Sequence, residues 1–300
     1  MGKYYYIAYG VNIKSDFEVP DLTKDKSEST DVIFKYGSLS IEIKSGERGA
    51  MLYNPVNSEF IFSISDIATY CITQGKKIIV DPEPGSTMED VHVYLLGTAF
   101  GILLHQRGIL PIHGSAILNR NDAVIFAGDS SSGKSTLAAG CAVRGYGVIS
   151  DDISALSITN TSKVTIFPGI PHIKLCKDSI EYFGLYNQLV SRTPNQEKGK
   201  VDIPRSNFIS EPSVLSKIII IEPHLKNDVL TTEIFGTDKL HHLMKQTYRL
   251  WAIHKLGITA NHFKLVSKLA NEIRLFRVYR SMRESSINSF IDYIEETILR

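Results

Sequence analysis

Cysteine is scarce in this chain of 300 residues, and the three cysteines that it has are scattered. Cys71, Cys141 and Cys176 form no Cys-x-x-Cys pair. A disulfide framework needs a patterned, even set of cysteines, so this odd set argues against a disulfide-stabilised secreted scaffold and predicts reduced thiols. We therefore expect a cytoplasmic protein.

An excess of charge of either sign is lacking as well. Lys and Arg number 33 and Asp and Glu number 32, so the composition gives no electrostatic reason to bind nucleic acid or an anionic membrane surface. No apolar run approaches the ~18 residues that a membrane-spanning helix needs, and the first residues have no apolar core of a signal peptide. These absences predict that neither nucleic acid nor a membrane is a partner.

What the chain does contain is a complete phosphate-binding motif. Residues 128–135 read Gly-Asp-Ser-Ser-Ser-Gly-Lys-Ser, which is the P-loop pattern with its lysine and hydroxyl in register. In such a loop, backbone N–H groups cradle the phosphates of ATP or another nucleoside triphosphate, Lys134 reaches the β- and γ-phosphates, and Ser135 ligates Mg²⁺. The alternative is an ordinary Gly/Ser turn that contains a lysine. The residues expected to hold the nucleotide are Gly128, Asp129, Ser130, Ser131, Ser132, Gly133, Lys134, Ser135 and Thr136.

The surroundings of the motif favour the phosphate-binding interpretation. Residues 123–127, Ala-Val-Ile-Phe-Ala, form a short apolar run suited to a buried strand, and residues 136–144 have a helical pattern. The phosphates would then lie at a helix N-terminus, where free N–H groups and the helix dipole favour anions.

A carboxylate must complete a P-loop site, and two candidates follow the loop. Asp151 and Asp152 come directly after the apolar residues 148–149, one helix and a turn beyond Lys134, so their strand is expected beside the P-loop strand. One acid can serve the metal while its neighbour takes a proton from an attacking hydroxyl; a polar turn after a strand is the alternative. The second candidate, Glu222 after the apolar run 218–221, is explained better as a solvated turn.

A histidine and a pair of lysines complete the set of candidates. His113 lies in a predicted strand just before the P-loop strand, where it is either a hydrogen-bonded core residue or a group that orients an acid or contacts phosphate. Lys198 and Lys200 end a polar stretch, 191–199, that we expect to be a mobile loop. Such a loop could close over a bound nucleotide or a peptide carboxylate, although an ordinary solvated loop is the favoured interpretation.

The pattern of the chain changes near residue 88. Residues 1–87 alternate in the manner of short strands and predict a β-rich N-terminal domain, whereas residues 88–300 are expected to form the catalytic domain, beginning with a helix at 88–106. After the strand at 217–222, the C-terminal hundred residues are expected to be mainly helical. Strands are expected at 110–118, 123–127, 147–150, 154–158, 163–167, 217–222 and 275–279, and further helices at 238–256, 260–272 and 284–298.

Three motifs, His113-Gly-Ser-Ala, the P-loop and Ser150-Asp151-Asp152, together resemble the catalytic domain of HPr kinase/phosphorylase in order and spacing. The resemblance covers residues 88–160 well and the C-terminal third loosely. It implies an α/β fold with a P-loop core related to phosphoenolpyruvate carboxykinase, and it gives each matching residue a role. Asp152 would be the base that deprotonates an acceptor serine, with Lys134 and His113 as its catalytic partners, and Ser135 and Asp151 would hold Mg²⁺.

The chain departs from that family in one informative place. The glycine-rich signature that follows the acidic pair, and that is tied to phosphorylase activity, is not recognisable in residues 166–174, Ile-Phe-Pro-Gly-Ile-Pro-His-Ile-Lys. This predicts a kinase without the reverse reaction. The family's active-site arginine has no clear counterpart, with Arg249 and Arg277 as candidates. The β-rich N-terminal part resembles a subset of relatives that phosphorylate the C-terminal serine of lasso-peptide precursors.

The favoured function is therefore a serine kinase that uses ATP and Mg²⁺ and acts on a peptide or small protein. A small-molecule kinase and a nucleotide-gated regulatory module are the alternatives. A GTPase switch is disfavoured because no guanine-reading Asn/Thr-Lys-x-Asp motif follows the loop. Some relatives form hexamers, so a homo-oligomer is compatible with the resemblance, although the N-terminal part of this chain differs from theirs.

Overall fold

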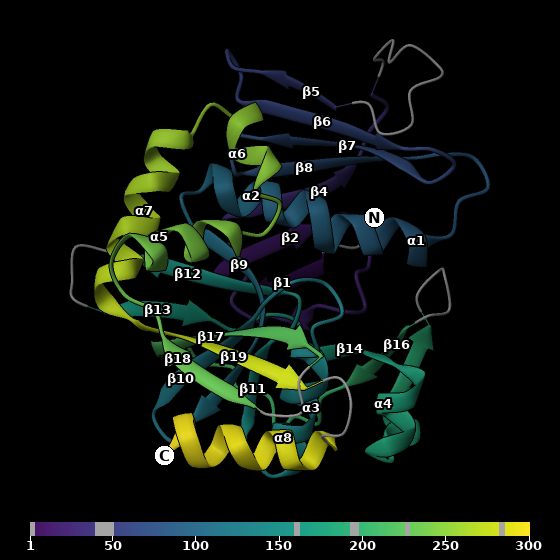
Figure 1. Cartoon of the computed structure of the whole chain (residues 1–300). Helices are drawn as coiled ribbons and strands as arrows, with labels where there is room; N and C mark the ends of the chain where they lie inside the picture. The colour runs from purple at the N-terminus through teal and green to yellow at the C-terminus, as the bar shows by residue number, and fades with distance from the viewer. Residues whose placement is uncertain (1–3, 40–50, 159–162, 193–197, 226–228, 282–285) are drawn as a thin grey trace. The chain divides into compact units, whose positions relative to one another are not determined.

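The computed structural model describes residues 4–39, 51–158, 163–192, 198–225, 229–281 and 286–300. It has a mixed α/β architecture with many strands, which confirms the coarse fold class (Figure 1). Contacts divide the chain into two compact units, one made of residues 1–111 and 248–262, the other of residues 112–247 and 263–300. The chain therefore passes from the first unit to the second and back before it ends in the second.

The first unit contains an eight-stranded mixed sheet in the order β3-β1-β2-β4-β8-β7-β6-β5. Alternate residues of these strands are buried, for example Phe60 and Phe62 in β6, as expected for strands with one face on a core. β2 pairs with β4, and β4 with β8, in parallel, whereas the other neighbours are antiparallel. The strands are β1 (Tyr4–Ala8), β2 (Val11–Ser15), β3 (Thr23–Lys24), β4 (Val32–Tyr36), β5 (Met51–Asn54), β6 (Glu59–Ile64), β7 (Ala68–Thr73) and β8 (Lys77–Pro82).

A helical segment packs on this sheet. Its parts are α1 (Met88–Tyr94), the π-helical turn η1 (Leu95–Ala99) and α2 (Phe100–Gln106). Thr87 caps α1, since its side-chain oxygen accepts a hydrogen bond from the backbone N–H of Asp90. The segment contacts β7, so the contacts group residues 88–111 with the N-terminal strands. The domain boundary expected at 87/88 stays a prediction.

The second unit is built on another eight-stranded sheet, in the order β10-β9-β12-β13-β17-β19-β18, with β11 paired to β9 and a further pairing between β10 and β17. β10, β17 and β19 run parallel to one another, so their C-terminal ends lie together at one edge of the sheet. The strands are β9 (Leu110–Asn119), β10 (Asp122–Ala127), β11 (Gly147–Ser150), β12 (Ile153–Ile158), β13 (Val164–Phe167), β17 (Ser213–His224), β18 (Leu230–Glu233) and β19 (Arg274–Ser281).

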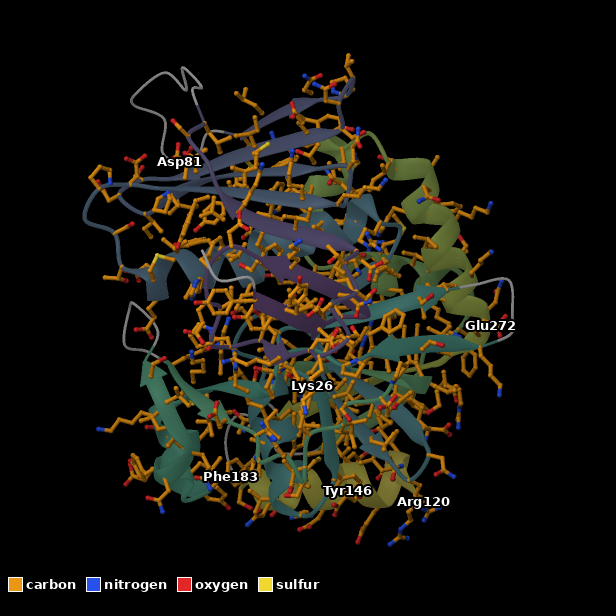
Figure 2. All side chains as sticks on the ribbon, turned by 180° about the vertical axis from the view of Figure 1, so that it is seen from behind. Lys26, Asp81, Arg120, Tyr146, Phe183 and Glu272 are labelled. Atoms are coloured by element: carbon orange, nitrogen blue, oxygen red, sulfur yellow. The ribbon has the colours of Figure 1, made fainter. Side chains whose placement is uncertain are left out.

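Two helices, α3 (Lys134–Val143) and α8 (Ile287–Ile294), cover one face of this sheet (Figure 1). Phe126 of β10 and Phe290 of α8 are both buried in the shared core, and burying a side chain of that size stabilises the fold by roughly 1.5–3 kcal/mol. Tyr146 and Phe183, labelled in Figure 2, pack against the edge of the same core. The core fixes where α3 starts, and therefore where the loop before it lies.

A smaller three-stranded sheet, β14-β16-β15, also belongs to the second unit. Its antiparallel strands pair Lys174 with Lys200 and Cys176 with Lys198. Apolar residues of this sheet, such as Ile173 and Val201, pack against Ala139 of α3. The bounds are β14 (His172–Cys176), α4 (Lys177–Tyr182), η2 (Leu185–Gln188), β15 (Leu189–Arg192) and β16 (Lys198–Asp202).

The remaining helices differ from the expected ones mainly where a long pattern is interrupted. The helix expected at 238–256 is two helices, because the chain turns at Gln246 and because Arg249 adopts a φ of 53°, which a right-handed helix does not allow. These helices and the last ones are α5 (Gly236–Lys245), α6 (Trp251–Lys255), α7 (Thr259–Glu272) and the π-helical turn η3 (Glu295–Leu299) after α8. Among the last hundred residues, β17 and β19 match the expected strands at 217–222 and 275–279 with wider bounds, whereas β18 was not expected.

Membrane-spanning helices and the state of the cysteines can be checked in the described residues. None of the helices in this part of the chain is both long and apolar enough to cross a membrane. The three cysteines are free thiols: Cys71 and Cys141 are buried and Cys176 is exposed. Burial raises the pKa of the Cys141 thiol to about 12, so this thiol is unreactive at neutral pH.

Candidate functional site

The P-loop connects the end of β10 to the start of α3, as its sequence predicts. Two positions of the loop require glycine. Gly128 has a φ of 136° and a β-carbon there would meet the carbonyl oxygen of Ile221 at 2.5 Å, and Gly133 has a φ of 99° where the helix begins. Ser131 also lies in the left-handed region, with a φ of 65°. The loop therefore has the tight path that presents backbone N–H groups to an anion.

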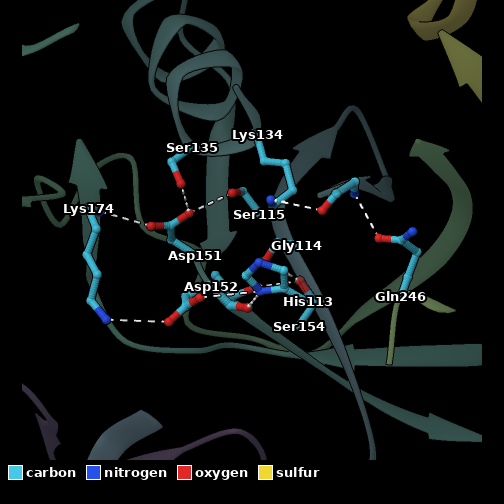
Figure 3. A network of polar contacts seen from close by, with 12 residues as sticks. His113, Gly114, Ser115, Lys134, Ser135, Asp151, Asp152, Ser154, Lys174 and Gln246 are labelled. Atoms are coloured by element: carbon cyan, nitrogen blue, oxygen red, sulfur yellow. Dashed lines mark hydrogen bonds and ion pairs between the residues drawn. The ribbon is translucent and has the colours of Figure 1, made fainter. Parts of the chain in front are cut away.

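Two hydrogen-bonded side chains hold the loop in this conformation (Figure 3). The buried side chain of Gln246 accepts a hydrogen bond from the N–H of Gly128 at 2.9 Å. Lys134 donates from Nζ to the carbonyl oxygens of Gly128 at 3.0 Å and Asp129 at 2.8 Å. Its ammonium has three N–H donors, so a third remains for a phosphate oxygen. Burial lowers the pKa of Lys134, and the charges of Asp151 and Asp152 oppose this shift.

Asp151 is a buried carboxylate that ties three segments together. Its Oδ1 accepts hydrogen bonds from Ser135 at 2.8 Å and from Ser115 at 2.5 Å, and its Oδ2 accepts one from the backbone N–H of Lys174 at 2.9 Å. Only 7% of Asp151 is exposed, and a buried carboxylate is tolerated only when it is hydrogen-bonded in this way. The P-loop hydroxyl and this carboxylate thus converge on one point.

Asp152 lies next to it with a different environment. Its carboxylate contacts His113 through Oδ1 and Lys174 through Oδ2, at 3.4 Å in each case (Figure 3). Nδ1 of His113 also lies 3.1 Å from the backbone carbonyl oxygen of Asp152. A carbonyl oxygen can only accept, so Nδ1 carries the proton and the ring is oriented by Asp152. About a third of the Asp152 side chain is exposed, so the carboxylate is open to a ligand.

The charge state of Asp152 follows from these neighbours. Burial raises the pKa of its carboxyl, but the positive charge of Lys174 and the hydrogen bond from His113 outweigh burial, and the pKa lies well below its ordinary value. Asp152 is therefore ionised throughout the neutral range. Its backbone has a φ of 67°, a left-handed conformation that costs a non-glycine residue free energy and that is concentrated at functional sites.

These groups surround a cleft of about 320 Å³. Of the residues expected at the site, the cleft is lined by Lys134, Ser135, Asp151, Asp152 and His113 together with Ser130, Ser131, Gly133 and Thr136. Gly128, Asp129 and Ser132 belong to the same loop but do not line the cleft. The Oγ of Ser132 is buried and has no hydrogen-bond partner among the described residues. The structure brings the expected set together, while the nucleotide, the metal and the individual roles stay predictions.

One spatial expectation was wrong. The strand that leads to Asp151 was expected directly beside the P-loop strand, but β11 pairs with β9, and β9 lies between β11 and β10. The acidic pair still reaches the P-loop because the chain turns at Asp151 and Asp152, between β11 and β12. The intervening strand β9 contributes Ser115 and His113, which contact one acid each.

Other sequence candidates lie elsewhere. Glu222 does not line the cleft and forms an ion pair with Arg277 at 3.3 Å, which supports the interpretation that it is not a metal ligand. Arg249, in the first unit, lies over the ring of Tyr248. Lys198 lines the cleft, and both Lys198 and Lys200 lie in strand β16. The segment expected to move lies largely outside the described residues, since 193–197 are not among them.

Sequence reasoning missed Lys174 and Gln246. Lys174 comes from the segment in which the family signature was not recognised, and it contacts both aspartates. It sits between two apolar residues of a strand, and no motif distinguishes it. Gln246 comes 118 residues after the glycine that it binds, and nothing in the sequence signals that separation. Only the alternation of Ile173, Lys174 and Leu175 could have placed Lys174 on the exposed face of a strand.

Comparisons with known proteins add little to this geometry. No protein-family model matches the chain, and no curated protein matches it. Among solved structures, the chain is similar to the Hpr(Ser) kinase/phosphatase from Coxiella burnetii, with 12% sequence identity and a TM-score of 0.33, over 63% of this chain and 93% of that chain. A TM-score of this size is no evidence of activity.

Proposed function

We propose that the protein is a kinase that transfers the γ-phosphoryl group of ATP, or of another nucleoside triphosphate, to a serine hydroxyl of a peptide or small protein. The observation that carries the proposal is the position of the acidic pair. Asp151 is bonded to the P-loop hydroxyl of Ser135 at 2.8 Å, and the adjacent Asp152 lines the same cleft. A module that only bound a nucleotide would not need a second, ionised carboxylate there.

The transfer can be written with the residues of the cleft in defined roles. The loop N–H groups and Lys134 hold the phosphate chain, and the acceptor serine lies beside Asp152. The serine oxygen forms a bond to the γ-phosphorus as the bond from that phosphorus to the β,γ-bridging oxygen breaks, and the electron pair of that bond remains on the nucleoside diphosphate. The serine proton passes to the carboxylate of Asp152. His113 and Lys174 hold this carboxylate in place and ionised.

The residues also fit Mg²⁺. Ser135 Oγ and Asp151 Oδ1 are hard oxygen donors 2.8 Å apart, and Mg²⁺ is usually bound by one or two carboxylates together with substrate phosphates and water. No cluster of three or more His, Cys, Asp or Glu side chains suited to a metal ion occurs among the described residues, which fits a site completed by phosphate oxygens. When bound, the ion would neutralise charge on the β- and γ-phosphates. Ser135 and Asp151 would orient it.

The finer assignment of the acceptor rests on the sequence resemblance. We propose that the acceptor is the C-terminal serine of a lasso-peptide precursor. The tests of the transfer and of the acceptor are separate. A set of serine-containing peptides with free and amidated C-termini distinguishes a terminal from an internal serine, and small alcohols test the alternative of a small-molecule kinase.

The test of the transfer is incubation of the protein with γ-labelled ATP, Mg²⁺ and these acceptors, followed by location of the label by mass spectrometry. Asp152→Asn removes the base and keeps the loop, so we expect nucleotide binding to persist and transfer to fall by about 10²- to 10⁴-fold. Asp178→Asn, an exposed acid in the first turn of α4 outside the cleft, is the matched control and should keep wild-type transfer. Wild-type transfer by Asp152→Asn would show that Asp152 is not the base.

A further inference from the structure

Arg280 lies at the edge of the second sheet where the P-loop begins. It is the second-last residue of β19, which runs parallel to β17 with Arg280 opposite Pro223, and β17 in turn runs parallel to the P-loop strand β10. The guanidinium reaches the loop itself, because a β-carbon on Gly133 would collide with Nη1 of Arg280. Gly133 is the loop residue directly before Lys134. The arginine therefore contacts the loop at its phosphate-binding turn.

The charge of Arg280 has no counter-ion in the part of the chain that the structure describes. No carboxylate there lies within ion-pair distance of it, and its Nε is buried without a hydrogen-bond partner. Burial lowers the pKa of the guanidinium. The other arginines of the same strand are paired: Arg274 with Glu233 at 2.7 Å and Arg277 with Glu222 at 3.3 Å. A partly buried cation with no partner is unfavourable, so this site is suited to an anion such as phosphate.

The orientation of the guanidinium is also constrained. Its central carbon lies 5.5 Å from the ring centroid of Phe290, which is buried in the core beneath α3 and α8. This cation–π contact holds the charge against a rigid part of the fold. Gly133, with its φ of 99°, has no β-carbon, and the guanidinium lies in the space that the side chain of any other residue would fill. The arginine is thus held beside the loop before any ligand binds.

We propose that Arg280 is a phosphate-binding residue that donates hydrogen bonds to the phosphate chain held by the P-loop. Its strand β19 is joined to the P-loop strand β10 through β17, whereas β9, whose residues contact the acidic pair, pairs with β10 on the other side. This inference rests on the proposed nucleotide site, but it does not depend on the identity of the acceptor. Guanidinium is suited to the role because its fork of N–H donors matches phosphate oxygens in a bidentate arrangement. With Lys134 it would supply two cations to the phosphates.

The experiment compares nucleotide binding by the full chain and its variants by isothermal titration calorimetry, with MgATP, MgADP and inorganic tripolyphosphate as ligands. Arg280→Met should raise the Kd of each ligand by about 10- to 100-fold, the effect of losing a charge-assisted hydrogen bond. Arg280→Lys keeps the charge without the fork and should recover part of the affinity. Arg274→Met, on the same strand and paired with Glu233, is the matched control and should bind as the wild type does.

The outcomes separate this inference from the proposed function. A Kd for Arg280→Met within about twofold of the wild-type value would overturn the role of Arg280, as would a wild-type chain that binds none of the three ligands. If the wild type binds all three but transfers phosphate to no acceptor, the kinase proposal fails, and the affinities still decide the role of Arg280. Thermal unfolding without ligand checks the fold, and if Arg280→Met does not fold, Arg280→Lys and Arg280→Gln are compared instead.

Discussion

Replacing Lys174 by methionine tests whether the charge of this lysine lowers the pKa of Asp152. The substitution removes the charge that lies 3.4 Å from Oδ2 of Asp152, and it keeps the backbone N–H that bonds to Asp151. Two unit charges at that distance interact by about 5 kcal/mol at an effective dielectric constant of about 20. Since roughly a third of each side chain is exposed, solvent screens the pair, and we expect about 1–2 kcal/mol, or about 0.7–1.5 pKa units.

The sign of the effect is set by the direction of the shift. The pKa of Asp152 is lower in the folded chain than in the unfolded chain, so ionised Asp152 contributes stability above its ordinary pKa of about 3.9, and this contribution is lost as the pH falls through the folded value. In Lys174→Met the folded pKa rises toward the ordinary value. The free energy of unfolding should then depend less steeply on pH in the acid range, while Asp152 stays ionised at neutral pH.

The assay is a ¹³C NMR titration of the aspartate carboxyl groups, with the Asp152 signal assigned from Asp152→Asn. In the wild type the signal should remain that of a carboxylate down to low pH. In Lys174→Met the midpoint of the titration should lie at a higher pH. Lys177→Met, an exposed lysine at the start of α4 outside the cleft, controls for the loss of a nearby positive charge. An unchanged Asp152 titration in Lys174→Met would refute the electrostatic role of Lys174 and leave it as a packing residue.

Two further substitutions test the support of the loop and of the metal. Gln246→Ala leaves the buried N–H of Gly128 without its acceptor, so we expect a loss of about 1–3 kcal/mol in the free energy of unfolding, measured by urea denaturation, together with weaker ATP binding; unchanged values would mean that the loop needs no such support. Ser135→Ala removes a metal-facing hydroxyl but leaves Asp151 bonded to Ser115 and Lys174, so the Mg²⁺ concentration that half-saturates ATP binding should rise several-fold, by roughly the 1 kcal/mol of one hydrogen bond. An Mg²⁺ dependence identical to that of the wild type would remove Ser135 from the metal site.

The parts of the site that lie close together in the sequence could be predicted from it. The apolar strand, the glycine-rich loop and the helix are consecutive, so the strand β10 and the helix α3 on either side of the loop were confirmed with small changes of boundary. His113 and the acidic pair were also placed at the same cleft, because short, regular connections bring neighbouring elements together. The neighbour of β11 was not predicted correctly, since β9 hydrogen-bonds to both β10 and β11 and lies between them.

The parts that come from far along the chain could not be predicted. Lys174, Gln246 and Arg280 reach the loop or the acidic pair only because the second sheet and the small sheet bring distant segments to one edge. Each is an ordinary polar residue in an alternating or helical pattern, and hydrophobic periodicity predicts which face it occupies but not what it contacts. The break after α5 was missed for a related reason, since the helical pattern continues through Gln246 while its side chain bonds to a glycine elsewhere.

The backbone of Asp152 limits which amino acids this position can hold. With a φ of 67°, the site accepts glycine without strain and tolerates aspartate and asparagine better than other residues, whereas β-branched side chains are strongly disfavoured there. Other residues at position 152 should lower the free energy of unfolding, by up to roughly 1–2 kcal/mol, relative to these three. Among them only aspartate carries a negative charge, so the shape of the turn and the charge of the cleft together select a single residue type.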